Sequence, residues 1–187
     1  GGAGFIGSNL CRHLIALGWD VTAFDKLTYA GHMSSLAAII DHSGFHFIHA
    51  DICDREAVAA AFDTVRPDAV MHLAAESHVD RSIRASNDFI QTNIVGTAVL
   101  LDAARTWRDR LSAPARDTFR FLHVSTDEVY GSLGPTGLFT EASPADPRSP
   151  YSASKAAADH LVSAWTHTYG LPCIISRSEE RRAGKES

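Results

Sequence analysis

The chain opens on a glycine-rich loop that runs directly into a segment of helical period. Gly1, Gly4 and Gly7 recur every third residue, and apolar residues at helical spacing then run over residues 5–17 and stop at Gly18. Backbone N–H groups at a helix N-terminus bind anions such as pyrophosphate, and glycines let the anion approach where a Cβ would block it. Glycine-rich turns before helices also occur as plain packing devices, so other features must support a ligand role.

Short β-rich apolar runs alternate with longer helical segments along the whole chain. This alternation is typical of strand–helix units around a parallel sheet. Strands are expected at 21–25, 45–49, 69–73, 119–124 and 173–176, and helices at 5–17, 54–65, 87–105 and 151–170. The predicted fold class is therefore α/β, a Rossmann-like doubly wound parallel sheet. The apolar strand that should precede the glycine loop is missing, so we expect the chain to be a truncated form of that fold.

Composition excludes several classes of protein. The 187 residues are 45% hydrophobic and 21% charged, which suits one globular domain with a core. The formal charge is −5, so there is no excess of positive charge for a nucleic acid partner. No stretch reaches the ~18–20 apolar residues of a membrane span.

The cysteines and histidines suggest neither disulfides nor a metal site. Cys11, Cys53 and Cys173 are odd in number and widely spaced. They suit reduced thiols better than a disulfide framework, so we expect a cytoplasmic location. The ten histidines show no pairs at metal-ligand spacing, and no metal site is predicted.

Acidic residues follow the second and third expected strands. Asp25 ends the strand after the loop, near the ~20-residue spacing at which a carboxylate binds the adenosine ribose. A carboxylate there would repel a ribose phosphate and so favours NAD over NADP, a preference that Lys26 weakens slightly. Asp51 and Ile52 are placed to contact adenine. A turn role for Asp25, and a cap or turn role for Asp51, are the alternatives.

The strand that ends at Leu73 is followed by the small residues Ala74 and Ala75, which let backbone pass close to a flat ligand. His78 and Arg81 then come near the carboxyl edge of the sheet, where open α/β folds bind ligands. This edge is therefore predicted to be the ligand side of the domain.

Tyr151 and Lys155 are four residues apart on an expected helix, so they share one face. A neighbouring ammonium lowers the pKa of a phenol, which allows tyrosine to act as a base near neutral pH. With a serine or threonine from the preceding strand end, this pair removes a hydroxyl proton while hydride goes to nicotinamide.

Two adjacent carboxylic acids follow the strand 119–124. Asp127 and Glu128 come after Ser125 and Thr126, at the carboxyl edge of the sheet. Two carboxyls in different environments can divide labour as general acid and general base, which is what eliminating water from a sugar requires. The alternative is that they only cap the next turn.

These motifs together resemble a known family. The chain is similar to the extended short-chain dehydrogenase/reductase superfamily, and within it to the dTDP-glucose 4,6-dehydratase family, in GGAGFIGSN, DKLTYAG, ADICD, HLAAESHVDRSI, NIVGT, STDEVYG and SPYSASKAAADHLV. The resemblance runs from Gly1 to about Ser176. It implies NAD lined by Gly1, Gly4, Phe5, Ile6, Gly7, Asp25, Lys26, Leu27, Thr28, Asp51, Ile52, Leu73, Ala74, Ala75, Ser77, Thr92, Tyr151 and Lys155.

The resemblance also implies a redox-neutral reaction on dTDP-glucose. Tyr151 would deprotonate the hydroxyl on carbon 4 with Lys155 tuning it, and Thr126 and Ser77 would contact the substrate. Glu128 would take the proton from carbon 5 while Asp127 protonates the hydroxyl that leaves carbon 6. The product would be a 4-keto-6-deoxy sugar nucleotide.

Several departures from the family pattern limit this expectation. Residues 1–177 would form a partial NAD-binding domain, and the C-terminal substrate domain is missing. Residues 178–187 match nothing in the pattern and are expected to be foreign. We therefore expect the isolated chain to be inactive. The intact parent is expected to form a homodimer through helices 87–105 and 151–170.

Two alternatives remain. A related sugar-nucleotide dehydratase or 4-epimerase acting on a UDP- or GDP-sugar would share the glycine loop and the Tyr151–Lys155 pair, although epimerases usually lack the Asp–Glu pair. A non-catalytic nucleotide-binding module would have kept the fold and lost its chemistry.

Overall fold

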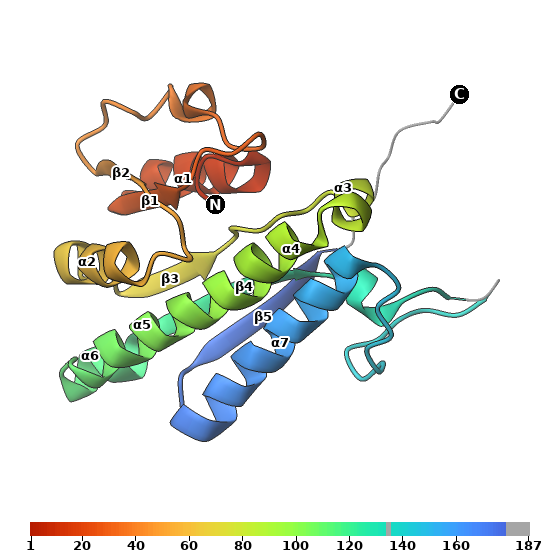
Figure 1. The fold of residues 1–187 in the computed structure, drawn as a ribbon. Coiled ribbons are helices and arrows are strands. Elements are labelled where there is room, and N and C mark those ends of the chain that lie inside the picture. The colour runs from red at the N-terminus through yellow and green to blue at the C-terminus, as the bar shows by residue number, and fades with distance from the viewer. Residues whose placement is uncertain (134–135, 179–187) are drawn as a thin grey trace.

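The computed structural model describes residues 1–133 and 136–178 (Figure 1). Its elements in chain order are α1 (Phe5–Ala16), β1 (Val21–Asp25), η1 (Met33–Leu36), β2 (Phe45–His49), α2 (Arg55–Val65), β3 (Ala69–His72), α3 (Val79–Arg84), α4 (Ser86–Phe89), the π-helical η2 (Ile90–Gly96), α5 (Thr97–Asp109), α6 (Ala113–Thr118), β4 (Arg120–Thr126), η3 (Asp127–Tyr130), α7 (Pro150–Tyr169) and β5 (Cys173–Ser178). All described strand pairs are parallel, which confirms the predicted α/β class.

The strands form two separate ladders. β1 pairs with β2, while β3, β4 and β5 form a second sheet in that order. Gly1 lies between the two. Its amino group donates to the carbonyl of Phe24 at 2.7 Å, and a Cβ added to it would lie 2.4 Å from the backbone nitrogen of Ala74. Gly1 therefore lies against β1 on one side and against the segment that follows β3 on the other.

Capping residues mark several helix boundaries. Asp54 accepts hydrogen bonds from the backbone N–H groups of Glu56 and Ala57, and so caps α2. Ser149 and Ser152 form a reciprocal capping box at the start of α7. Gly18 follows α1 with a φ of +82°, a conformation that costs glycine little.

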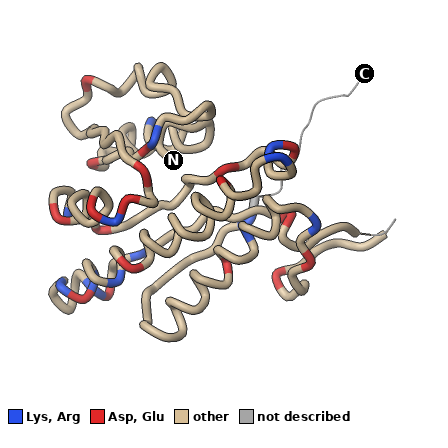
Figure 2. Tube along the Cα trace, in the orientation of Figure 1, with Lys and Arg blue, Asp and Glu red and all other residues tan. Residues whose placement is uncertain are grey.

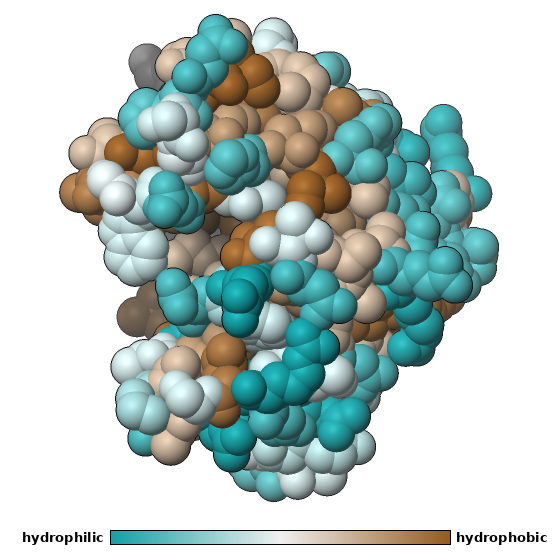
Figure 3. Space-filling view, turned by 90° about the vertical axis from the view of Figure 1, so that its left-hand side faces the viewer, coloured by the Kyte–Doolittle hydropathy of each residue, from teal (hydrophilic) through white to brown (hydrophobic). Residues whose placement is uncertain are grey.

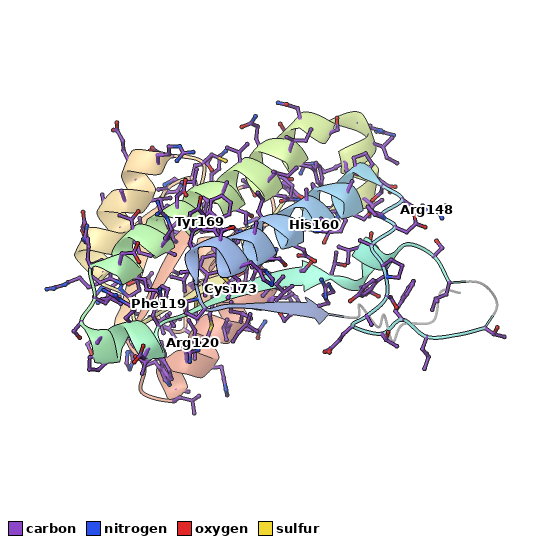
Figure 4. The ribbon with its side chains drawn as sticks, turned by 90° about the horizontal axis from the view of Figure 1, so that it is seen from below. Phe119, Arg120, Arg148, His160, Tyr169 and Cys173 are labelled. Carbon is purple, nitrogen blue, oxygen red and sulfur yellow. The ribbon has the colours of Figure 1, made fainter. Side chains whose placement is uncertain are left out.

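Two hydrophobic clusters form the core. The larger lies between the β3–β4–β5 sheet and helices α2, α5 and α7, with Phe121, Leu101 and Val162 fully buried. Figure 1 shows α5 and α7 running side by side along this sheet. Seen from below, Tyr169 lies at the end of α7 and Phe119 at the start of β4 (Figure 4). The smaller cluster packs α1 and η1 against β1 and β2.

The surface has no single chemical character. Lys and Arg are interspersed with Asp and Glu along the coloured trace in Figure 2. The face turned to the viewer in Figure 3 shows apolar side chains scattered among polar ones. None of the helices in the described residues is long and apolar enough to span a bilayer.

Some boundaries differ from the sequence expectation. The predicted helix 87–105 begins at Ser86, passes through the π-helical turn η2 and ends at Asp109. The strand predicted at 119–124 extends to Thr126 because its last residues still pair with β5. Short elements that lack a strong apolar period, such as α3 and α6, were not predicted.

Candidate functional site

The glycine loop leaves open space at the N-terminus of α1. A Cβ on Gly7 would lie 2.0 Å from the carbonyl oxygen of Gly1, so packing alone requires glycine there. At Gly4 the nearest atom would be 3.6 Å away. The side chains of Phe5 and Ile6 in the first turn are 86% and 55% exposed. This helix N-terminus therefore has both free backbone and uncovered apolar surface, as a cofactor site needs.

Asp25 ties the glycine loop to the end of β1. Its carboxylate accepts hydrogen bonds from the backbone N–H of Ala3 at 2.9 Å and of Leu27 at 2.8 Å. The side chain is buried, so its position is fixed by these contacts. Each carboxylate oxygen has a further lone pair, and the ribose contact predicted for Asp25 stays a prediction.

A polar cavity of about 410 Å³ lies beside the loop that follows β2. It is lined by Lys26, Asp51, Cys53, Glu76, Asp88, Gln91 and Thr92. Three residues predicted to bind cofactor, Lys26, Asp51 and Thr92, thus come together here. The other four were not predicted to line a site. Cys53 and Glu76 lie within motifs without an expected binding role, Asp88 and Gln91 lie in none, and the fold brings all four to this cavity.

Charge inside this cavity is paired. The ammonium of Lys26 lies 2.5 Å from the carboxylate of Asp51, and this hydrogen bond raises the pKa of Lys26. Burial raises the pKa of Asp51, but hydrogen bonds from the Cys53 backbone and from Lys26 outweigh burial, so its pKa lies below the usual value. Burial raises the pKa of Cys53 to about 11, and its thiol stays protonated at neutral pH.

The remaining predicted cofactor residues divide by exposure. Ile52 is buried in the larger core cluster, so only its backbone is available to line the site. Leu73, Ala74 and Ala75 follow β3 and are partly exposed, while Ser77 is exposed. Thr28 lies in the loop after β1 and is partly exposed as well.

Tyr151 and Lys155 stand on the first turns of α7. The ring of Tyr151 meets that of Phe89 edge-on, with centroids 6.2 Å apart. Lys155 is 4% exposed and donates a hydrogen bond of 2.8 Å to the carbonyl of Val124 on β4. Burial lowers the pKa of Lys155 to about 8. Its ammonium is therefore fixed against the strand that leads to the two predicted carboxylates.

Those carboxylates begin η3, directly after β4. Thr126 ends the strand and caps this turn: its hydroxyl accepts from the backbone N–H of Glu128 at 3.3 Å and donates to Asp127 at 3.3 Å. Thr126 is thus the residue whose side chain caps this turn, and the chemical roles expected of Asp127 and Glu128 stay predictions. η3 packs against α7, the helix that carries Tyr151.

A buried amide connects these parts. The side chain of Asn93, in the π-helical turn, donates to the hydroxyl of Ser154 at 2.8 Å and to the carbonyl of Glu76 at 3.0 Å, and it accepts from the N–H of Glu76 at 2.9 Å. Ser154 in turn donates to the carbonyl of Tyr151. Asn93 therefore holds the loop after β3 against α7. Asn93 begins the NIVGT motif of the resemblance, but the sequence analysis gave it no role.

The exposed loops above the site also touch. The guanidinium of Arg81 lies 3.8 Å from the ring centroid of Tyr29, and the His78 ring lies 5.4 Å from the same ring. This contact joins the loop after β1 to α3. In the described part of the chain, no cluster of three or more His, Cys, Asp or Glu could hold a metal ion.

Known proteins with similar sequences include sugar-nucleotide dehydratases. A family model described as GDP-mannose 4,6 dehydratase matches residues 1–184. The chain belongs to this dehydratase family. A probable dTDP-glucose 4,6-dehydratase of Sinorhizobium fredii is 57% identical over 176 residues, which are 94% of this chain and 50% of that protein.

Two solved structures, a dehydratase and an epimerase, are similar to this dehydratase-family chain. DesIV, a dTDP-glucose 4,6-dehydratase from Streptomyces venezuelae with NAD and TYD bound, superimposes with a TM-score of 0.85 at 43% identity over 95% of this chain and 53% of that one. A UDP-glucose 4-epimerase of Thermus thermophilus in complex with NAD gives 0.82 at 32% identity, over 95% and 52%. The chain spans about half the length of the relatives it matches.

Proposed function

We propose that the protein to which this chain belongs is an NAD-dependent dTDP-glucose 4,6-dehydratase. The observation that carries the proposal is that η3, with Asp127 and Glu128, packs against the start of the helix that holds Tyr151 and a buried Lys155. The names of the Sinorhizobium fredii relative and of DesIV support the same reaction. The −5 charge and the open edge of the sheet suit a small-molecule substrate better than a nucleic acid.

The residues present fit NAD. Gly4 offers space at a helix N-terminus for the pyrophosphate, and the cavity lined by Lys26, Asp51 and Thr92 offers polar groups beside it. When bound, NAD would supply the acceptor that takes hydride from carbon 4 and returns it at carbon 6. We assign the other predicted cofactor residues to the same site.

The chain's own groups would carry the protons. Tyr151, as a phenolate stabilised by the Lys155 charge, takes the proton of the carbon 4 hydroxyl, which Thr126 binds. The 4-ketone acidifies carbon 5, from which Glu128 takes a proton. Asp127 protonates the hydroxyl that leaves carbon 6, so water is eliminated. Glu128 returns its proton to carbon 5 when carbon 6 receives hydride, which completes the 4-keto-6-deoxy sugar.

A related sugar-nucleotide enzyme is the second candidate, favoured by the 32% identity to the UDP-glucose 4-epimerase. The Asp127–Glu128 pair argues against simple epimerisation, because that reaction eliminates nothing. Nucleotide selection is expected to depend on parts that the relatives have and this chain lacks.

We also propose that the complete protein is a cytoplasmic homodimer. Exposed apolar residues on η2 and α7 include Ile90 at 46% and Tyr169 at 48%. Figure 1 shows the helical segment from α4 to α5, which contains η2, running side by side with α7. We expect a second copy to pack on these helices as a four-helix arrangement. Sedimentation of the complete protein as a monomer would contradict this.

The proposed activity can be tested in a hybrid enzyme, in which residues 1–177 replace the matching half of the Sinorhizobium fredii relative. The hybrid is incubated with dTDP-, UDP- and GDP-glucose, and the base-labile 4-keto product is measured. We expect turnover of dTDP-glucose without added oxidant. Epimerised sugar without a 4-keto-6-deoxy product would support the second candidate instead.

A further inference from the structure

A group of ionisable side chains, of which Asp159, His123 and His72 are buried and Arg177 is partly exposed, lies behind the site and plays no part in the proton transfers above. Asp159 is 6% exposed and stands four residues after Lys155, on the same face of α7. The guanidinium of Arg177, on β5, reaches one oxygen of Asp159 at 3.1 Å and 3.3 Å. Nε2 of His123, on β4, lies 3.4 Å from the other oxygen. A carboxylate is thus enclosed between one helix and two strands.

Among the described residues, three titratable groups on the neighbouring strands face Lys155 and Asp159. His123 faces them from β4, Arg177 from β5 and His72 from β3, behind His123 with ring centroids 5.2 Å apart. Burial lowers the pKa of both histidines, so they are neutral at pH 7. Asp159 is therefore the negative charge that faces the Lys155 ammonium from within this group.

Burying an ammonium is costly unless an opposite charge lies near it. The carbonyl of Val124 gives Lys155 a hydrogen bond but no full charge. Burial lowers the pKa of Lys155 to about 8, and Asp159 works against that effect. Burial raises the pKa of Asp159, but contacts with His123 and Ser125, followed by the charge of Arg177, bring it below the usual value, so the carboxylate is ionised. The guanidinium of Arg177 also holds it in place.

We propose that Asp159 is a positioning residue of this site: its buried carboxylate, held by Arg177, keeps the Lys155 ammonium charged one helical turn from Tyr151. Asp159 touches neither substrate nor cofactor and acts through Lys155. The inference rests on the proposed function for its kinetic readout alone, because the charge state of Lys155 can be measured without turnover.

The direct test titrates Lys155 by NMR. The chain has three lysines, Lys26, Lys155 and Lys185, so ¹³Cε-lysine labelling gives three signals, and Lys155→Met identifies the relevant one. Asp159→Asn should lower the midpoint of Lys155 by about one to three pH units, while Asp159→Glu keeps it near wild type. Asp102→Asn is the matched control, since this carboxylate pairs with Arg55 on the surface.

Loosening of the core cannot mimic this result. A lysine that gains solvent moves up toward the ordinary value of ~10.4, whereas loss of the Asp159 charge moves it down. An unchanged or raised midpoint in Asp159→Asn overturns the inference. If that variant does not melt cooperatively, Arg177→Gln decides instead: freeing Asp159 of its cation raises the midpoint in a folded protein, and no change contradicts the inference.

The kinetic test uses the hybrid enzyme. In Asp159→Asn the alkaline limb of the kcat/KM profile should fall to lower pH together with the Lys155 midpoint, while KM for dTDP-glucose stays within about twofold. A limb that does not move with the midpoint overturns the positioning role. A hybrid that lacks dehydratase activity but shows the lowered midpoint refutes the proposed function and leaves the assignment of Asp159 standing.

Discussion

The ammonium of Lys155 donates a 2.8 Å hydrogen bond to the carbonyl oxygen of Val124. This contact fastens α7 to the strand that delivers Thr126, Asp127 and Glu128 two to four residues later. Helix and turn therefore cannot shift independently. The buried lysine thus joins the packing of η3 on α7 in setting where the two carboxylates lie relative to α7.

That burial has a measurable thermodynamic signature. The pKa of Lys155 is about 8 in the folded chain and 10.5 ordinarily. Between these values the unfolded chain binds the extra proton, so stability rises with pH across this window. Relative to Lys155→Met, wild type should gain up to ~3 kcal/mol from pH 8 to 10.5. Urea melts at several pH values measure the free energy of unfolding of both proteins. The buried thiols oppose this trend, but they are present in both proteins and cancel in the difference.

The buried histidines predict how stability changes at acid pH. Burial lowers the pKa of His72 and His123 below 6.5. Below pH 6.5 these residues take up protons only in the unfolded chain, so stability is lost as pH falls. Each should contribute a slope of up to ~1.4 kcal/mol per pH unit. His72→Gln should flatten the acid limb of the stability profile, and His46→Gln, on the exposed side of β2, should not. Equal slopes in all three proteins would contradict this.

Two glycines of the same loop should respond differently to alanine. At Gly7 a Cβ would lie 2.0 Å from the Gly1 carbonyl, so Gly7→Ala should cost about 1–3 kcal/mol or more. At Gly4 nothing in the chain obstructs a Cβ. Gly4→Ala should change stability by no more than ~1 kcal/mol and weaken NAD binding at least tenfold in the hybrid enzyme. Calorimetry measures both, and unchanged NAD affinity in Gly4→Ala would remove the pyrophosphate from this loop.

The isolated chain should have little or no dehydratase activity. β1 and β3 are not paired with each other, and only Gly1 lies between their ends. Adding the Sinorhizobium fredii relative's preceding residues should raise the melting temperature by joining the two ladders. Activity should still require the rest of that relative. Robust turnover of dTDP-glucose by the 187-residue chain would contradict this prediction.

Local chemistry made much of the fold predictable. Helix ends are set by local contacts: Asp54 and Ser149 bond to N–H groups two or three residues later, and Gly18 takes the positive φ that ends α1. The order of strands and helices was predictable because short β-rich apolar runs alternate with segments of helical period along the chain.

The missed features depend on tertiary contacts. Asn93 matters because it meets Glu76 and Ser154, which are 17 and 61 residues away. Asp159 and Arg177 are ordinary charged residues in the sequence and form a pair only when α7 packs on β5. The predicted site residues come from local motifs, and their roles with ligands stay predictions. The foreign tail predicted at 178–187 lies almost wholly outside the described residues.

The central claim is that Glu128 removes the carbon 5 proton after Tyr151 and Lys155 have enabled oxidation at carbon 4. The most direct test mixes dTDP-glucose with the Glu128→Gln hybrid and follows NADH absorbance together with release of water from carbon 6. We expect NADH to accumulate on the enzyme while elimination falls at least a hundredfold. Unimpaired formation of the 4-keto-6-deoxy product, or loss of NAD reduction itself, would contradict the account.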